Sequence, residues 1–376
     1  MNIKYISYYD TPEGKTEVAL SAVNKMNYII DVLRRINMNV DIISASICNS
    51  EIKTTGEYRK IRDGVMLKTF DSFPGGNIFK RFIRRLKIKR QLKSYLNKNI
   101  KNGDIVFIYH SLNYIFLYRW LLKKKHAKVV LEVEELYTDV AKSRFATRQK
   151  ELKYLSYATA YMFPTSLLNN VVNVDNKPSI IIHGTYQSEE SCGQPFNDGK
   201  VHVVYAGTFD PRKGGVQAAA AAARFLTNGY HVHILGFGSA GDTKNLLRTI
   251  DDISKKTECI ITYDGLKSGE EYIRFIQSCD IGLSTQNPEA AFNATSFPSK
   301  ILSYMANGLR VVSIRIPVIE QSAVGDYMYY YDKQTPEEIA KAIMQVDLND
   351  GYDSRQIIKH LDEKLLNVIN ILIGEL

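Results

Sequence analysis

The sequence predicts an α/β protein with two doubly wound domains, each built on a parallel sheet covered by helices. Three observations predict this class. The chain has 376 residues, 45% of them hydrophobic, which is enough for two separate cores. Short apolar runs alternate with longer stretches of helical period, as is typical of parallel sheets. A polar segment near residue 190 interrupts this alternation, which then starts again.

In the first half, each short apolar run bounded by polar residues predicts a strand. These strands are Ile3–Tyr8, Val40–Ala45, Val65–Phe70, Ile105–Tyr109, Val129–Val133 and Ser179–Ile182. Apolar residues at helical spacing predict the connecting helices. These helices are Glu17–Asn37, Asn77–Asn97, Leu112–Lys125 and Glu151–Tyr161.

The second half repeats the pattern. Its predicted strands are Val201–Tyr205, His231–Leu235, Cys259–Tyr263, Ile281–Ser284 and Arg310–Ser313. Its predicted helices are Gly215–Thr227, Thr243–Lys255, Gly269–Ser278 and Pro298–Asn307.

The polar segment sets the expected domain boundaries. It lacks periodicity and contains Gly and Pro, which predicts a linker at residues 188–199. The first domain is then residues 1–187 and the second residues 200–353. Residues 354–376 carry one apolar stripe at helical spacing. This predicts a terminal helix that packs either on its own domain or back on the first one.

Composition excludes several classes of protein. The four cysteines are far apart and form no C-x-x-C, which argues against a disulfide scaffold or a cysteine-based zinc site. No segment is long and apolar enough to span a bilayer, and the first ten residues lack the basic region of a signal peptide. We therefore expect a cytoplasmic protein, which can still lie on the inner face of a membrane.

Residues 206–215, AGTFDPRKGG, predict a turn that binds a diphosphate. They follow a strand and precede a helix, and glycines let backbone N–H groups approach an anion at the helix N-terminus. Lys213 adds a positive charge at the same place. The alternative is an ordinary turn with a solvent-exposed lysine.

Residues 296–312, SFPSKILSYMANGLRVV, predict a helix that begins at Pro298 and ends at Gly308. Ser299 and Lys300 fall in its first turn, where a cation opposes the helix dipole unless an anion compensates. A core helix with a glycine cap explains the apolar residues of this segment. It does not explain Ser299 and Lys300.

The order of these two motifs, with LGFGSAG (235–241) and YDGLKSGEEYIRFIQSCDIGLS (263–284) between them, resembles the donor-binding domain of family 4 glycosyltransferases. The resemblance is strong over residues 201–331 and weaker over the first half. It implies the GT-B architecture, with two Rossmann-like domains facing a central cleft. It also implies retaining transfer of a hexosyl unit.

The resemblance assigns site residues by position. Its catalytic positions fall on Glu134, Glu135 and Lys213. Its donor-binding positions fall on Gly14, Gly207, Thr208, Lys213, Gly265, Ser299, Lys300 and Ser303.

Two of these positions depart from the family pattern. Thr208 replaces the usual arginine of the diphosphate loop, which removes a bidentate phosphate contact. Ser303 replaces the glutamate that usually binds the ribose. These changes indicate weaker donor binding, a different donor or a degenerate site. No strict D-x-D is present, so we expect neither a metal nor another cofactor.

The acidic cluster near residue 134 can also be interpreted from its spacing, without the resemblance. Glu132 and Glu134 are expected two apart on one strand and thus on one face, near the carboxyl end where ligands bind. Ion-paired or solvated acids are the alternative. His110 is expected to be a hydrogen-bonded structural residue, and His183 to lie nearer a ligand.

The positive charge is concentrated in the first half. Lys and Arg exceed Asp and Glu by 14 over residues 1–175, whereas the overall excess is 9. Ten of these bases and no acid lie between Lys80 and Lys101, and Phe79, Phe82, Ile83 and Leu86 form an apolar stripe beside them. Such a helix is typical of one lying on anionic lipid, or else of a solvated face. No nucleic-acid-binding module is recognisable.

These observations predict a glycosyltransferase that moves a hexosyl unit from a UDP- or GDP-linked sugar to a glycan or lipid-linked acceptor. Assembly of a surface polysaccharide fits the basic helix. Two alternatives remain open: a non-catalytic protein of the same fold that binds sugar or a partner, and a nucleotide-sugar epimerase.

Overall fold

The computed structural model describes residues 1–48, 53–140, 147–209 and 215–376. The chain divides into two compact units, Met1–Thr185 with Lys364–Leu376, and Tyr186–Glu363. Each unit is described by itself.

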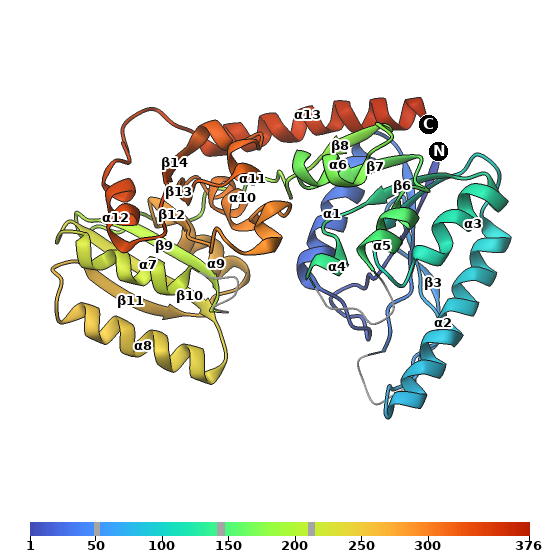
Figure 1. The fold of residues 1–376 in the computed structure, drawn as a ribbon, viewed down its shortest axis with the longest axis horizontal. Coiled ribbons are helices and arrows are strands. Elements are labelled where there is room, and N and C mark those ends of the chain that lie inside the picture. Colours follow the sequence, from blue (N-terminus) through green and yellow to red (C-terminus); the bar gives the residue numbers. More distant parts are fainter. Residues whose placement is uncertain (49–52, 141–146, 210–214) are drawn as a thin grey trace. The chain divides into compact units, whose positions relative to one another are not determined.

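The first unit is built on an eight-stranded sheet (Figure 1). Its strands are β1 (Asn2–Ser7), β2 (Asn39–Ser44), β3 (Tyr58–Arg62), β4 (Val65–Lys68), β5 (Ile105–Tyr109), β6 (Lys128–Glu132), β7 (Ala160–Phe163) and β8 (Ser179–Ile181). They are ordered β3-β4-β2-β1-β5-β6-β7-β8. All neighbours are parallel except β3, which pairs antiparallel with β4 at the edge. The order reverses between β1 and β5, where doubly wound sheets bind ligands at their carboxyl ends.

Helices connect the strands of the first unit. They are α1 (Leu20–Arg35), α2 (Ile78–Asn99), α3 (Ile115–Lys125), α4 (Tyr137–Val140), α5 (Arg148–Leu155) and α6 (Ser166–Val172). Asn77 caps α2 by accepting a hydrogen bond from the Lys80 N–H. Only Arg84, Ile88, Leu92 and Leu96 of α2 are buried, so this helix docks through its second half.

The second unit is a six-stranded parallel sheet with the order β11-β10-β9-β12-β13-β14. Its strands are β9 (Val201–Thr208), β10 (Tyr230–Phe237), β11 (Ile260–Gly265), β12 (Ile281–Ser284), β13 (Arg310–Ile314) and β14 (Met328–Tyr331). Counted from β9, this is the 3-2-1-4-5-6 order of a Rossmann domain. The predicted fold class, two doubly wound parallel-sheet domains, is therefore confirmed.

The first four helices of the second unit follow the predicted alternation, and the last two were not predicted. They are α7 (Val216–Ala222), α8 (Ala240–Ser254), α9 (Gly269–Gln277), α10 (Ser299–Ala306), α11 (Pro317–Glu320) and α12 (Pro336–Met344). Pro298 is the N-cap of α10 rather than its first residue. The residues expected as a linker pack on this unit, because the Gln277 side chain accepts hydrogen bonds from the N–H groups of Cys192 and Gly193.

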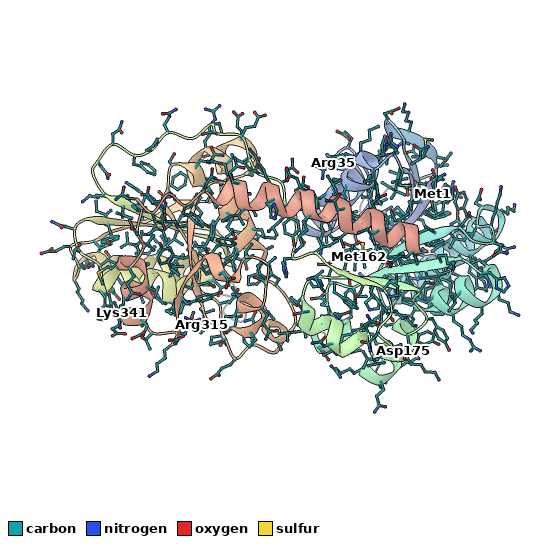
Figure 2. All side chains as sticks on the ribbon, turned by 90° about the horizontal axis from the view of Figure 1, so that it is seen from above. Met1, Arg35, Met162, Asp175, Arg315 and Lys341 are labelled. Atoms are coloured by element: carbon teal, nitrogen blue, oxygen red, sulfur yellow. The ribbon has the colours of Figure 1, made fainter. Side chains whose placement is uncertain are left out.

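The last helix, α13 (Ser354–Glu375), begins in the second unit, and its residues from Lys364 onward belong to the first. Side chains fill both units between sheets and helices (Figure 2). Every helix within the described ranges is too short or too polar for a transmembrane span.

Candidate functional site

A pocket of about 220 Å³ opens at the carboxyl ends of β9 and β10 in the second unit. It is lined by Ala206, Gly207, Thr208, Leu235, Gly236, Phe237, Leu266, Lys267 and Tyr272. This is the sheet edge at which doubly wound folds bind their ligands. The pocket brings together the predicted donor-binding residues Gly207 and Thr208 with three segments that follow or end neighbouring strands.

Two glycines make the pocket floor. Gly207 and Gly236 are paired across β9 and β10. A Cβ on Gly236 would lie 1.8 Å from the Gly207 carbonyl oxygen, and its φ of +132° is one that side-chain-bearing residues rarely adopt. The chain therefore needs glycine at residue 236, and the two backbones approach closely enough to leave an open floor.

Lys300 reaches this floor from the first turn of α10. A Cβ on Gly207 would lie 3.3 Å from the Lys300 Nζ, so the ammonium sits directly at the strand end. The Nζ lies 3.9 Å from the centroid of the Tyr205 ring, a cation–π contact. Among the described residues this ammonium has no hydrogen-bond or carboxylate partner. Burial lowers the pKa of Lys300 to about 7. A half-buried amine without an anion among the described residues is arranged to receive one.

The other predicted residues of this unit lie around the same edge. Ser299 is exposed and is the first residue of α10, directly after the N-cap Pro298. Ser303 lies one turn further on, and its hydroxyl is 3.2 Å from that of Tyr272 in the pocket lining. Gly265 ends β11 with a φ of +78°, which turns the chain toward the lining residue Leu266. Lys213 lies outside the described residues.

In the first unit, the acidic cluster differs from the expectation. β6 ends at Glu132, so Glu134 is not on the strand. Its carboxylate is ion-paired with the Lys25 Nζ at 2.5 Å, and the same Nζ donates to the carbonyl of Ile182. Glu132 is fully buried and accepts a hydrogen bond from the Tyr5 hydroxyl. Burial and the nearby charge of Glu134 raise the pKa of Glu132 to about 7.

Glu134 is thus ion-paired, and ion-paired acids were the expected alternative to a contact with a ligand. Glu135 is half-buried next to it. Their assignment as catalytic residues remains a prediction.

The two histidines of this unit are held by protein groups. His110 is buried between the Tyr118 hydroxyl and the Glu151 carboxylate, each 2.8 Å away, as expected for a structural residue. His183 contacts the carbonyl of Pro164 at 2.7 Å, and burial lowers its pKa to about 4.

Gly14 belongs to a tight turn after β1. Its N–H donates to the carbonyl of Thr11, and an added Cβ would lie 2.0 Å from the Asp10 carboxyl carbon. The Asp10 carboxylate also accepts hydrogen bonds from the backbone N–H and the hydroxyl of Thr16. The predicted donor-binding residue Gly14 thus lies in a turn folded around Asp10.

A second pocket, also about 220 Å³, opens in the first unit beyond β1 and β2. Its lining residues are Tyr8, Glu17, Ala45, Ile47, Arg85, Ile88, Lys89, Leu92, Asn113, Tyr114 and Phe116. Tyr8 and Tyr114 stack with ring centroids 4.9 Å apart. Burial and the charge of Arg85 lower the pKa of Lys89. Aromatic rings, polar groups and two cations are suited to an anionic sugar derivative.

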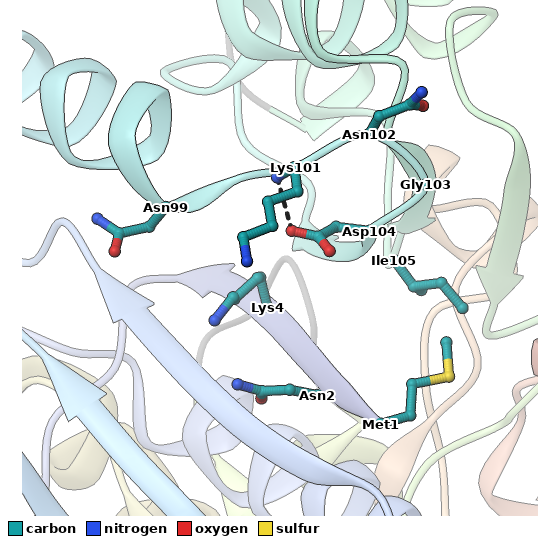
Figure 3. A pocket seen from close by; sticks show the side chains of 9 residues that line it. All are labelled: Met1, Asn2, Lys4, Asn99, Lys101, Asn102, Gly103, Asp104 and Ile105. Atoms are coloured by element: carbon teal, nitrogen blue, oxygen red, sulfur yellow. Dashed lines mark hydrogen bonds between the residues drawn. The ribbon is translucent and has the colours of Figure 1, made fainter.

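Another hollow, of about 430 Å³, lies elsewhere in this unit (Figure 3). It opens at the amino ends of β1 and β5, between Asn2, Lys4 and Ile105. Lys4 is ion-paired with Asp41, and the Lys101 N–H donates to the Asp104 carboxylate. Because ligands of doubly wound sheets bind at the carboxyl ends, this hollow is not the candidate site.

Sequence reasoning missed several parts of both sites. Tyr205 and Tyr272 read as ordinary core residues of β9 and α9, and Gly236 as a loop residue. A sequence signal existed only for Gly236, since GFG after a strand marks a close backbone approach. Lys25 gave no signal, because its partner Glu134 is 109 residues away.

Comparison with known proteins finds one family model that is similar to part of the second unit. Residues 200–348 match the profile of the family described as Glycosyl transferases group 1. No curated protein matches the sequence.

Solved structures match the whole chain. One is described as trehalose-6-phosphate from E. coli bound with UDP-2-fluoro glucose, with a TM-score of 0.68 and 10% identity over 100% of this chain and 98% of that one. Sucrose-phosphate synthase from Thermosynechococcus elongatus gives 0.67 and 16% over the same shares. Identities this low show the fold alone. Residues 200–348 are therefore similar to a glycosyl transferases group 1 domain, and the chain has the GT-B fold of these solved structures.

Proposed function

We propose that this protein is a retaining hexosyltransferase, similar to family 4, that uses a UDP- or GDP-linked sugar. The observation that carries the proposal is the Lys300 ammonium. It lies beside Gly207 of the pocket lining and has no carboxylate partner among the residues that the structure describes. A nucleotide diphosphate would supply an anion at this position.

The pocket offers several groups to the donor. The Lys300 ammonium binds the diphosphate, and the free N–H groups at the start of α10 add further donors near Ser299. As the bond between the sugar and the diphosphate breaks, negative charge grows on the leaving oxygen, where a fixed cation stabilises it most. The resemblance places Lys213 at the same diphosphate. These groups need no metal ion to act.

The base and ribose of the donor would lie toward Tyr272 and Ser303. Their hydroxyls are 3.2 Å apart, and Tyr272 lines the pocket. A serine hydroxyl binds ribose less firmly than the carboxylate usual at this position. The contacts of Leu266, which follows Gly265, would then fall on the base.

The acceptor would bind the first unit. Arg85 and Lys89 line its pocket together with the stacked Tyr8 and Tyr114, which favours an acceptor that carries a phosphate. A sugar phosphate and a glycan on a lipid diphosphate share this chemistry. One solved neighbour, from Burkholderia xenovorans, is described in complex with glucose-6-phosphate.

In the reaction, the bond between the anomeric carbon and the diphosphate breaks and a bond to the acceptor hydroxyl oxygen forms. The acceptor hydroxyl gives its proton to an oxygen of the leaving diphosphate or to a basic side chain. Retention of configuration is supported by a solved neighbour, a trehalose-6-phosphate synthase described in terms of glycosyl transfer with retention. Glu134 and Glu135 remain the proposed acidic groups beside the acceptor.

Incubation with a panel of UDP- and GDP-sugars separates the proposal from its rivals. A transferase hydrolyses one donor slowly and transfers its sugar when an acceptor is added, and NMR of the product shows the anomeric configuration. Epimerised donor without transfer indicates an epimerase. Binding without turnover indicates a non-catalytic protein, which the departures at Thr208 and Ser303 would explain.

We also propose that α2 holds the protein at an anionic membrane surface, where a lipid-linked acceptor for a surface polysaccharide would lie. Four apolar side chains of its first turns are strongly exposed: Ile78, Phe79, Phe82 and Ile83 are 85%, 68%, 58% and 41% accessible. Basic residues flank them, each worth about 1 kcal/mol near anionic lipid. Arg84 is not one of these, because it is buried against the carbonyls of Cys48 and Phe73.

Liposome sedimentation tests this placement. Wild-type protein should bind anionic vesicles more than neutral ones, and 1 M salt should remove most but not all of the binding. Changing Arg81 and Arg85 to Ser should weaken binding to anionic vesicles, whereas changing Phe79 and Phe82 to Ser should remove the part that resists salt. Equal binding to neutral and anionic vesicles would contradict the proposal.

A further inference from the structure

Three histidines converge in the second unit, apart from the donor pocket. His231 and His233 are two residues apart on β10 and share a face of the sheet, and His202 on β9 is the register partner of His231. One nitrogen from each ring lies within 4.8 Å of the others. None of the three lines the pocket, and His202 precedes Gly207 by roughly 16 Å of strand.

We propose that His202, His231 and His233 form a binding site for a divalent transition-metal cation of the zinc class. Neutral imidazole is a preferred ligand of zinc, and three such ligands leave the fourth position of a tetrahedral ion to water. Because His202 and His231 are register partners, the strands β9 and β10 hold their rings at adjacent positions with or without the ion.

The first argument is the second shell of these rings. The Nε2 of His202 is 2.9 Å from an Asp198 oxygen, and the Nδ1 of His233 is 3.1 Å from an Asp264 oxygen. Metal-binding histidines characteristically give their outer N–H to a carboxylate, which fixes the ring and makes the inner nitrogen a better ligand. The Nε2 of His231 likewise has a partner, the Thr262 hydroxyl at 3.1 Å.

The second argument is the contact between the two inner nitrogens. The Nδ1 of His202 and the Nε2 of His233 are 2.9 Å apart. If each ring gives its outer proton to its carboxylate, both inner nitrogens of the neutral rings carry lone pairs, which repel one another at this distance. A proton or a metal ion at this contact removes the repulsion, and only a divalent metal joins the third ring as well.

The geometry requires only small movements. Metal–nitrogen bonds of about 2.0–2.1 Å in a tetrahedral site separate the ligand nitrogens by roughly 3.3 Å. The close pair must therefore open by a few tenths of an ångström, and the His231 ring, now stacked on His233 with centroids 3.9 Å apart, must turn toward the ion. The Phe196 ring stacks on His202 and on His233, with centroids 4.1 Å and 5.3 Å apart.

Cobalt substitution gives the most direct test on the full chain. Co²⁺ added to metal-free wild-type protein should bind one equivalent and give the strong visible bands of a tetrahedral ion, which Zn²⁺ should abolish by displacement. His233→Gln should lose these bands. Asp264→Asn, which keeps all three ligands, should weaken binding roughly 10–100-fold. His360→Gln, an exposed histidine on α13, is the matched control and should bind as the wild type does.

Circular dichroism tests whether each variant is folded. If His233→Gln does not fold, His231→Gln takes its place. Absence of tetrahedral bands in wild-type protein would overturn the proposal and leave a proton at the contact. Equal binding by a folded variant that lacks a ligand would overturn it as well.

Discussion

Replacing Lys300 by Met should weaken donor binding while stabilising the free protein. Methionine keeps the length of the side chain and removes the charge. In the free protein, burial lowers the pKa of Lys300 from its ordinary value of 10.5 to about 7. A shift of this size corresponds to about 4 kcal/mol of destabilisation at pH 7. The cation–π contact with the Tyr205 ring offsets about 2 kcal/mol of this destabilisation. The free energy of unfolding of Lys300→Met should therefore be about 2 kcal/mol higher than that of the wild type.

Donor binding should change in the opposite direction. A charge-assisted hydrogen bond to phosphate contributes about 1.5–3 kcal/mol, so Lys300→Met should bind the nucleotide sugar roughly 10–150-fold more weakly at pH 7. Lys341→Met is the matched control, since Lys341 is exposed on α12 (Figure 2). It should change neither affinity nor stability measurably.

The pH dependence gives the sharpest form of this test. Below pH 7 the amine is already protonated in the free protein, so the affinity for the donor should not change with pH. Above pH 7 the free protein loses the proton that the diphosphate requires, and affinity should fall by up to tenfold per pH unit. Calorimetric titration with a nucleotide sugar from pH 6 to 9 measures this, because its diphosphate does not titrate in that range. A flat profile for wild-type protein, or an unchanged affinity of Lys300→Met, would refute the reasoning.

Three further changes test other parts of the account. Gly236→Ala should lower the thermal midpoint by many degrees or prevent folding, because its Cβ would lie 1.8 Å from the Gly207 carbonyl oxygen. Ser303→Glu should change the affinity for UDP or GDP in calorimetry if the residue faces the ribose beside Tyr272, and equal affinities would remove it from the site. Glu132→Gln should be more stable than wild type by about 3 kcal/mol at pH 8 in urea unfolding. Because the pKa of Glu132 is raised to about 7, the wild type loses stability as the pH rises from 4.5 through 7. The free energies of unfolding of the two proteins should therefore be equal below pH 4.5.

The sequence predicted the fold well because its signals are local. Parallel strands buried on both faces are continuous apolar runs, and the helices between them carry a regular stripe. Two strands of the first unit escaped detection. β3 reads YRKIR and lies at the sheet edge, where charged residues are tolerated and no apolar run is needed. β7 follows α5 after four residues, and the predicted helix Glu151–Tyr161 ran into its first two residues.

The sites were less predictable because they depend on contacts far apart in the sequence. The position of Lys300 in a first helical turn was visible, but its contact with the Tyr205 ring 95 residues earlier was not. The pairing of Glu134 with Lys25 likewise connects a loop after β6 with α1. Glycines are the exception, since a glycine after a buried strand indicates close backbone approach whatever lies opposite.

Hydrogen exchange with and without a nucleotide sugar tests the central claim most directly, because it locates the donor on the chain. The account predicts protection of backbone amides in residues 206–209, 235–238, 264–272 and 298–304, which form or adjoin the pocket of the second unit. Lys300→Met should reduce this protection at equal donor concentration. Protection confined to other residues, or none at a concentration that supports turnover, would contradict the claim that this pocket binds the donor.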